Sequence, residues 1–134
     1  MLAPLNEHRR ALAVVALPDG VYALGGYNGS DYLLTVERYD LSKDCWEYVK
    51  SMNNARCTFS ATVSSPDFQY IYVMGGFNGS PMDVVERYSV FQDSWEFITP
   101  MKNARFMHSC AFTAQQGVGL GNCFVKGQNQ LFDQ

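Results

Sequence analysis

The side chains best suited to chemistry are few and widely spaced. The chain has two histidines and four cysteines: His8, His108, Cys45, Cys57, Cys110 and Cys123. Zinc sites usually draw on closely spaced pairs, such as two cysteines separated by two residues. No such pair occurs here, and the cysteines are too sparse for a small disulfide-bonded scaffold. The sequence therefore indicates neither a metal site nor another cofactor. It also indicates that the cysteines are kept reduced.

One short segment places nucleophilic side chains beside a histidine, since His108, Ser109 and Cys110 are consecutive. A catalytic nucleophile needs an activating base within hydrogen-bond reach, and the base usually needs an orienting partner. Neither a second histidine nor an acidic residue is placed to complete such a set. The segment also aligns with residues 57–61 of an internal repeat, which predicts a strand. We therefore expect that the protein is not an enzyme.

Charge and hydropathy exclude two classes of partner. The net charge is -3 and the isoelectric point is about 5.2, and the Lys and Arg residues are scattered. Nucleic-acid binding usually needs a basic cluster, so we expect no nucleic-acid partner. No apolar stretch approaches the ~20 residues of a membrane span, and residues 1–10 lack the apolar core of a signal peptide. We expect no membrane partner and a cytoplasmic location.

The elements that must position these side chains are set by an internal repeat of about 50 residues. Residues 22–30 (YALGGYNGS) return 50 positions later as 72–80 (YVMGGFNGS), and VERY returns 49 positions later. The motif Met-x-x-x-Arg also occurs twice, and a partial copy of it opens the chain. Three arginines are therefore equivalent: Arg9, Arg56 and Arg105. A repeat of this length must be considered before any single residue is interpreted.

Each copy predicts four short strands. Residues 11–17 are a continuous apolar run, which is typical of a strand covered on both faces. Residues 58–64 alternate polar and apolar side chains, as a half-buried strand does. Each run is followed by a Pro-Asp turn, then by a strand that ends in a double glycine. A third strand carries Glu-Arg-Tyr and a fourth begins at a tryptophan, so the fold class is all-β.

These landmarks divide the chain as follows: a link at 1–10, a first repeat unit at 11–50, a link at 51–57, a second unit at 58–98, a link at 99–106, the first strand of a third unit at 107–114, and a divergent tail at 115–134. A double glycine is due near Gly121 or Phe124, and none occurs. The tail is rich in Gly and Gln and matches nothing in the repeat.

The pattern resembles the kelch-repeat family, in particular kelch-like adaptors of the BTB-kelch type, over residues 1 to about 114. The residues that carry the resemblance are Gly25, Gly26, Gly75, Gly76, Glu37, Arg38, Tyr39, Glu86, Arg87, Tyr88, Trp46 and Trp95, with the Met-x-x-x-Arg links. A period near 50 with four strands is that of kelch propellers. The resemblance implies a partial β-propeller of four-stranded antiparallel blades, with about two and a third repeats present.

Physical reasons give these residues structural roles. Paired glycines at a strand end allow positive φ and close backbone approach. A tryptophan in each blade supplies a large apolar surface to the neighbouring blade, and its ring N–H needs a partner. Adjacent Glu and Arg point to opposite faces of the strand. The guanidinium groups of the link arginines are expected to satisfy loop carbonyls between blades.

The partner surface is implied by the resemblance to kelch-like adaptors. In such proteins, partners contact the loop after the double glycine and the residues just after the link arginine. The corresponding positions are Tyr27, Asn28, Phe77, Asn78, Arg10, Cys57 and Phe106. Both Asn-Gly-Ser segments fit a glycosylation acceptor, but Asn-Gly is also a strong turn signal and we favour the turn. Packing of the two aromatic residues on their own blade remains the alternative.

The function that follows is that of a protein–protein interaction module. The resemblance implies recognition of a partner or substrate, with a cullin ubiquitin ligase and a BTB domain relevant only to a longer parent protein. Actin or cytoskeleton binding, with a cytoskeletal location, is the second hypothesis. A fragment of a propeller enzyme such as a copper oxidase is the third.

The number of blades bears on assembly. Propellers close with ~4–8 blades, so two blades and a strand leave faces and edges open to self-association. Three alternatives remain: a piece of a longer protein, a ring completed by copies of the chain, or a tail that finishes the third blade.

Overall fold

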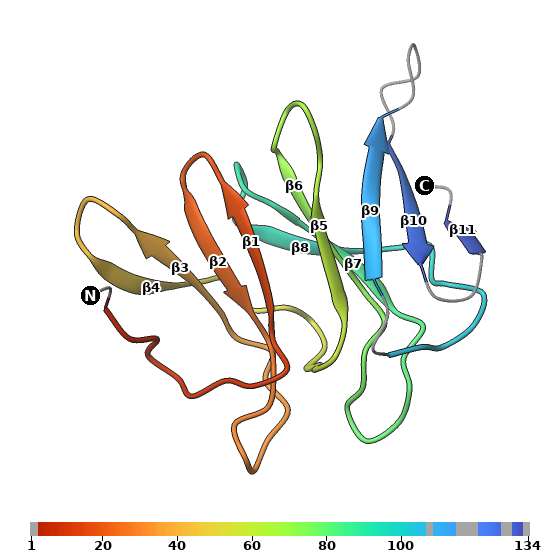
Figure 1. Cartoon of the computed structure of the whole chain (residues 1–134), viewed down its shortest axis with the longest axis horizontal. Helices are drawn as coiled ribbons and strands as arrows, with labels where there is room; N and C mark the ends of the chain where they lie inside the picture. Colours follow the sequence, from red (N-terminus) through yellow and green to blue (C-terminus); the bar gives the residue numbers. More distant parts are fainter. Residues whose placement is uncertain (1–2, 107–108, 115–120, 127–129, 133–134) are drawn as a thin grey trace.

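The computed structural model describes residues 3–106, 109–114, 121–126 and 130–132, with side chains up to Phe106. Every regular element in this part of the chain is a β-strand, as the sequence predicted. Three antiparallel sheets lie side by side (Figure 1), and the first strand of each sheet lies next to the first strand of its neighbour. We refer to the sheets as blades 1, 2 and 3. No helix in the described residues could cross a membrane.

Blade 1 has the strand order β1-β2-β3-β4. Its strands are β1 (Ala13–Leu17), β2 (Gly20–Leu24), β3 (Val36–Asp40) and β4 (Cys45–Val49). A two-residue turn joins the first two strands, whereas β2 and β3 are joined by a long loop that carries the double glycine and the Asn-Gly turn. In the register of this sheet, Tyr39 lies opposite Trp46, so both rings occupy the same face.

Blade 2 repeats this arrangement in the order β5-β6-β7-β8. Its strands are β5 (Ser60–Val63), β6 (Tyr70–Met74), β7 (Val85–Ser89) and β8 (Ser94–Ile98). Tyr88 lies opposite Trp95, in the same register as the corresponding pair of blade 1. The matching registers explain why tyrosine and tryptophan recur at the same spacing in both repeats, because the two rings of each pair must lie on the same face of their blade.

Blade 3 contains more strands than the sequence predicted. Strand β9 (Ser109–Ala114) pairs with β10 (Gly121–Lys126), which pairs with β11 (Gln130–Phe132). We expected one strand here and a tail unlike the repeat. Two strands of the tail extend the sheet instead, although the segment lacks the double glycine. Antiparallel pairing needs only backbone groups in register, so it does not require the repeat's marker residues.

The main core lies between blades 1 and 2. It includes Tyr22 and Leu24 from blade 1 and Ile71, Val73 and Tyr88 from blade 2. A smaller cluster of Tyr72, Met74, Val85 and Met101 lies on the opposite face of blade 2, toward blade 3. The two blades therefore pack as successive layers, and each strand alternates between the two faces of its blade.

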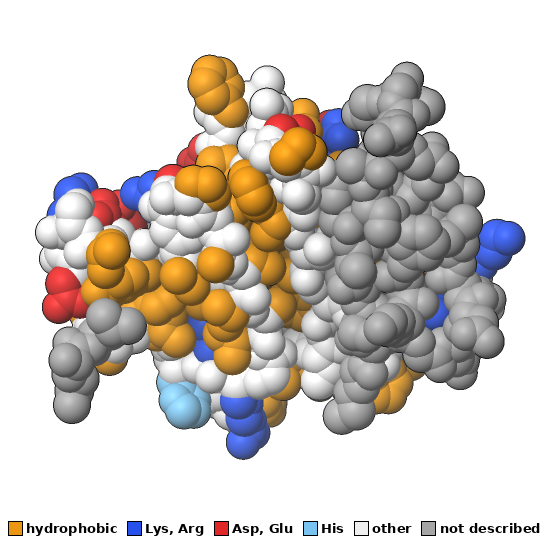
Figure 2. Space-filling model, turned by 45° about the horizontal axis from the view of Figure 1, so that its top comes forward, with side chains coloured by type: hydrophobic (Ala, Val, Ile, Leu, Met, Phe, Trp, Pro, Cys, Tyr) orange, Lys and Arg blue, Asp and Glu red, His pale blue; other side chains and the backbone are white. Residues whose placement is uncertain are grey.

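The prediction that the first strand is covered on both faces is wrong for β1. Val15 and Leu17 are buried against blade 2, but Val14 is 60% exposed and Ala16 is also exposed. The reason is geometric: alternate side chains point to the other face of blade 1, and no described strand covers that face at this position. Apolar side chains accordingly gather at the surface over blade 1, on the left of Figure 2.

Candidate functional site

The loops at one end of the blades bring the predicted partner-binding residues together. In blade 1, the backbone of Tyr27 pairs with both Arg10 and Tyr32. In blade 2, the backbone of Phe77 pairs in the same way with Cys57 and Pro81. Each double-glycine loop is therefore a small three-segment bridge. Residues far apart in the sequence are held side by side there by backbone hydrogen bonds of about the ordinary length, such as 2.9 Å from Tyr27 N to Arg10 O.

The double glycines make this close approach achievable, as the sequence predicted. Gly26 and Gly76 have φ values of 107° and 106°, which L-residues with side chains rarely adopt. A Cβ atom on Gly26 would lie 2.8 Å from the carbonyl oxygen of Arg10. A Cβ atom on Gly76 would lie 2.8 Å from the carbonyl oxygen of Cys57. Glycine is required here because the loop runs directly against the preceding link.

Four aromatic rings form a continuous row across the two blades. The ring centroids of Tyr27 and Tyr32 are 5.1 Å apart, those of Tyr32 and Phe77 are 6.0 Å apart, and those of Phe77 and Phe106 are 5.4 Å apart. We call these residues the aromatic row. Ring pairs at such separations attract one another beyond the area that they bury. The row is partly exposed, with Phe106 42% exposed at one end.

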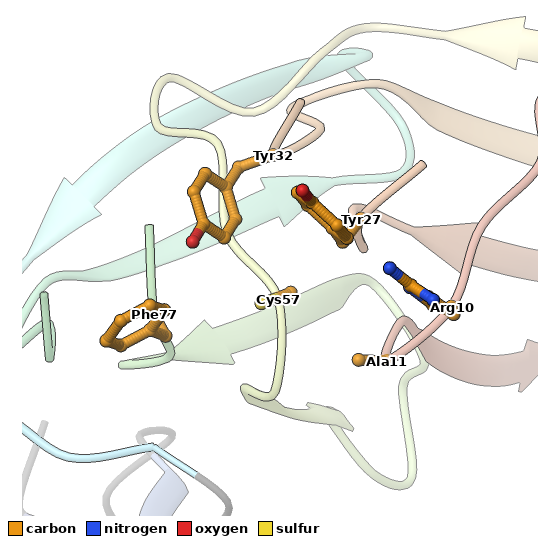
Figure 3. Close-up of a pocket in the computed structure, with 6 residues that line it drawn as sticks. All are labelled: Arg10, Ala11, Tyr27, Tyr32, Cys57 and Phe77. Atoms are coloured by element: carbon orange, nitrogen blue, oxygen red, sulfur yellow. The ribbon is translucent and has the colours of Figure 1, made fainter. Parts of the chain in front are cut away.

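A pocket of about 380 Å³ opens beside the aromatic row. It is lined by Arg10, Ala11, Tyr27, Tyr32, Cys57 and Phe77 (Figure 3). Five of these six lining residues carry apolar or aromatic side chains, and Arg10 alone is charged. Pockets with mostly apolar walls and one oriented polar group are typical of binding sites.

The predicted positions in this group differ in what they can offer a partner. Asn28 is engaged within its own turn, because its Oδ1 accepts hydrogen bonds from the backbone N–H groups of Ser30 and Asp31 at 2.9 and 2.7 Å. Asn78 is exposed at the equivalent turn. Cys57 is buried at the pocket wall. The sequence did not single out Tyr32, whose place in the row depends on the loop returning after the Asn-Gly turn.

A second set of predicted residues forms a buried latch between each link and its blade. The Arg9 guanidinium donates to the carboxylate of Glu37 at 2.9 Å and to the carbonyl oxygens of Gly25 and Thr35 at 2.9 and 2.8 Å. Both charged side chains are fully buried. The guanidinium group thus bonds carbonyls at the two ends of the β2–β3 loop, and these carbonyls belong to the blade that follows the link.

Blade 2 has the equivalent latch. Arg56 donates to Glu86 at 2.8 Å and to the carbonyl oxygens of Gly75 and Val84 at 2.9 and 3.0 Å. Burial lowers the pKa of Arg56 from its ordinary value, and the charge of Glu86 opposes this effect. Glu86 also accepts a hydrogen bond from the backbone N–H of Asn53 at 2.8 Å, whereas the Nε of Arg56 is buried without a hydrogen-bond partner. Arg105 is partly buried in the third link.

Each blade also has one aspartate that accepts a hydrogen bond from the tyrosine of the Glu-Arg-Tyr motif, and the sequence analysis did not single out either of them. Asp44 accepts a hydrogen bond from the Tyr39 hydroxyl at 2.5 Å, and Asp93 accepts one from the Tyr88 hydroxyl at 2.6 Å. These bonds lower the pKa of each carboxyl, and the bond to Asp44 raises the pKa of Tyr39 to about 12. The aspartates lie at the same place in the two repeats, which is the signal that could have revealed them.

The tryptophans contact the links through their ring N–H groups. The Nε1 group of Trp46 donates to the carbonyl oxygen of Ala3 at 2.9 Å, and that of Trp95 donates to the carbonyl oxygen of Lys50 at 2.8 Å. Both side chains are only partly buried. They lie on the last strand of each sheet, and only Trp95 packs against the main core.

The remaining arginines of the motif face the other way. Arg38 and Arg87 are partly exposed on the opposite face of their strands, as alternation predicts. Arg38 pairs with Asp19 and Glu47 at 3.3 Å each, and Arg87 pairs with Glu96. These surface pairs contribute little to stability.

The described residues contain no cluster of side chains suited to bind a metal ion. The segment that attracted a catalytic interpretation lies outside them, since the structure does not describe His108 or the side chains of Ser109 and Cys110. The site that the structure does show is an apolar and aromatic contact surface with one cation. Its chemistry is that of noncovalent recognition.

Fold and site together define a class: a repeat protein whose four-stranded blades present loops for contact. The Kelch motif profile matches residues 8–53 and 69–102, which is more than half of the chain. The chain belongs to the kelch-repeat family.

Curated relatives point the same way. The chain is 39% identical over 79 residues to influenza virus NS1A-binding protein homolog B of Danio rerio, and the matched segment covers 59% of this chain and 12% of that protein. It is 44% identical over 55 residues to human Kelch-like protein 4, covering 41% and 8% of the two chains. It is 33% identical over 75 residues to Kelch repeat and BTB domain-containing protein 2 of cowpox virus, covering 56% and 13%. The family and these relatives support a protein-interaction module.

Proposed function

We propose that this chain binds a protein partner through the aromatic row and the pocket beside it. The observation that carries the proposal is the continuity of the four rings across two blades, with ring-to-ring distances between 5.1 and 6.0 Å. Aromatic side chains and arginine are the residue types most often responsible for binding energy at protein interfaces. The rings lie on loops that a rigid sheet positions, which is where binding residues usually occur.

The alternative is that the rings only stabilise their own loops and contact no partner. The rings differ in this respect. The Tyr27 hydroxyl donates a hydrogen bond to the carbonyl oxygen of Gly29 at 3.1 Å, so Tyr27 helps to hold its own loop. Phe77 and Phe106 have no polar groups to satisfy and remain partly exposed. Contact of these apolar rings with water is unfavourable, and covering the rings with another molecule would remove that unfavourable free energy.

The experiment is partner capture with matched variants of the whole chain. Tyr27→Ala and Phe77→Ala should reduce the recovery of specifically bound proteins by tenfold or more. The control is Phe91→Ala, because Phe91 is 95% exposed in the β7–β8 turn, at the other end of blade 2. Equal recovery by all variants, with unchanged circular dichroism, would contradict the proposal.

The finer role that we propose is substrate or partner recognition within a larger adaptor protein. The support is the similarity to Kelch-like protein 4 and to a kelch repeat and BTB domain-containing protein. The matched part of the chain spans only 8% and 13% of the length of Kelch-like protein 4 and of the kelch repeat and BTB domain-containing protein. A link to a ubiquitin ligase is therefore proposed only for a longer protein that contains these repeats. Binding to actin is the second candidate, supported by the kelch repeat alone, and cosedimentation with filaments would test it. We propose no enzymatic activity.

A second contact surface is the uncovered face of blade 1, and we propose that it associates with another blade. Val14 is 60% exposed there, whereas Ala61, at the equivalent position of blade 2, packs against the main core. The two positions match in register, since Val14 lies opposite Ala23 and Ala61 lies opposite Val73. Light scattering of the chain should show self-association that Val14→Ser weakens. A monodisperse monomer would contradict this second proposal.

A further inference from the structure

The pocket beside the aromatic row has one charged group, and the structure leaves that charge uncompensated. Within the described residues, the Arg10 guanidinium forms no ion pair and no hydrogen bond. Its contact is with the Tyr27 ring, whose centroid lies 5.1 Å from the guanidinium carbon. By contrast, the neighbouring Arg9 has a carboxylate and two carbonyl oxygens as partners. The side chain of Arg10 is exposed, and it points toward Tyr27 in Figure 3.

The contact with Tyr27 also fixes where the charge lies. A cation–π contact does not use the guanidinium N–H groups as donors to another polar atom, so these donors remain available to a ligand. These donors can bind a carboxylate in a bidentate manner. The backbone N–H and carbonyl of Arg10 pair with Tyr27, which anchors the residue at the pocket rim.

A second unused polar group lies further along the row. Within the part of the chain that the structure describes, the Tyr32 hydroxyl forms no hydrogen bond. Its ring lies between those of Tyr27 and Phe77, at 5.1 and 6.0 Å between centroids (Figure 3). The pocket therefore offers a cation at one end, an apolar and aromatic floor, and a hydroxyl near its middle.

From this arrangement we infer that the pocket recognises an extended peptide segment in which an acidic side chain and an aromatic side chain are two residues apart. The inference rests on the proposed function and names the chemistry of the partner. The carboxylate pairs with Arg10 and the aromatic side chain packs against the exposed sides of Tyr32 and Phe77. In an extended chain, side chains two residues apart lie on the same face, so an acidic and an aromatic side chain at this spacing can both face the pocket.

A carboxylate fits the pocket better than a phosphate does. A phosphorylated side chain carries about -1.5 to -2 charges at neutral pH and is usually bound by a cluster of arginines. Arg10 is the single cation among the pocket's lining residues, so the site matches one negative charge. The segment is therefore expected to carry Asp or Glu, and a phosphoserine in its place is expected to bind no more tightly.

The test uses the whole chain and a fluorescein-labelled peptide with the central sequence Phe-Ser-Glu-Ser-Phe, which offers the spacing in both chain directions. Matched peptides replace Glu with Gln, Lys or phosphoserine, or both Phe with Ala. Fluorescence anisotropy measures the affinity of each for the wild-type chain, for Arg10→Ala and for Lys43→Ala. Lys43 is an exposed cation in the β3–β4 turn, so its variant removes the same charge away from the pocket.

The inference predicts that the Glu peptide binds about tenfold more tightly than the Gln peptide to the wild-type chain and to Lys43→Ala. On Arg10→Ala the difference should fall below about twofold, because the double substitution isolates the pairing. The Arg10 side chain is exposed and carries no hydrogen bond, so its loss should leave the fold intact.

Several results would overturn the inference. Equal affinity for the Glu and Gln peptides would do so, as would a loss on Arg10→Ala that is the same for both. Tighter binding of the phosphoserine peptide would assign a phosphorylated partner instead. If no peptide binds while Phe77→Ala still loses its captured partner, the acidic–aromatic specificity is wrong and the proposed function stands.

Discussion

Blades 1 and 2 carry the same residues in the same register but differ in what covers them. On blade 2, the face that bears Tyr88 and Trp95 meets blade 1, and Tyr88 lies 6.0 Å from Tyr22 between ring centroids. On blade 1, the equivalent face meets the link of residues 3–9 and, in the part of the chain that the structure describes, no further blade. The buried ion pair and the hydroxyl–aspartate bond are nevertheless present in both blades.

The difference shows which interactions belong to a single repeat and which need a neighbour. The latch is local, because the link supplies the arginine and the blade supplies its partners. Apolar burial is shared, because Val14 stays exposed where no blade covers it and Val63 of β5 packs against the main core. The buried ion pair therefore forms between a blade and its own link, whereas the apolar face of a blade is buried by a neighbouring blade.

The largest expected effect comes from breaking the latch that lies between the blades. Arg56→Ala should lower the free energy of unfolding by about 3–5 kcal/mol, because it leaves Glu86 buried without its cation. Arg9→Ala should cost less, since no described blade covers the latch of blade 1, and water can reach Glu37 once the arginine side chain is removed. Urea denaturation measures both. The partly exposed Arg87→Ala is the control and should cost less than ~1 kcal/mol. An equal cost for all three variants would contradict the comparison.

The tryptophans provide a smaller contrast. Trp95→Ala should lower the free energy of unfolding by about 2 kcal/mol, below the usual ~3–5 kcal/mol for a buried aromatic because the ring is only partly covered. Trp46→Ala should cost about 1 kcal/mol, because the link contacts it and the main core does not. If Trp46 proved the more costly of the two, the face of blade 1 would be better covered than the structure shows.

Acidification should weaken the aspartate bonds of the latch. The hydrogen bond from Tyr88 and the N–H of Lys50 lower the pKa of Asp93 below its ordinary value. A lowered folded-state pKa means that this stabilisation is complete above the unfolded value of about 3.9 and is lost as the pH falls through the folded value. The urea midpoint of the wild-type chain should therefore fall more steeply below about pH 4 than that of Asp93→Asn. Parallel midpoint curves for the two proteins would show that the bond adds no stability.

The smallest expected effect on stability is at the uncovered face. Val14→Ser should change the free energy of unfolding by less than ~0.5 kcal/mol, because the side chain is already largely exposed. Val63→Ser, on the covered face of blade 2, should cost about 1 kcal/mol through lost apolar burial. Thermal denaturation at low protein concentration compares the two without self-association. A large loss for Val14→Ser would mean that its face is buried in solution.

The sequence predicted the blades well and the contacts between them only in part. Two copies of the repeat were enough to place β1 to β8, because spacing and turn residues are local features. The pairing of Arg9 with Glu37 was not predicted, since 28 residues separate them and the strand register brings them together. Tyr32 was missed because the two copies differ by one residue after the Asn-Gly turn. The strands of the tail were missed because backbone pairing leaves little mark on its Gly-rich sequence.

The central claim is that the aromatic row is the surface that meets a protein partner. Site-specific photo-crosslinking tests it most directly, with p-benzoylphenylalanine placed at Phe77 in one variant and at Phe91 in another. Phe91 is the more exposed of the two, at 95%, so general stickiness would favour crosslinks there. The account predicts a discrete crosslinked protein from position 77 and none of that size from position 91. Crosslinking of the same protein only from position 91 would contradict it.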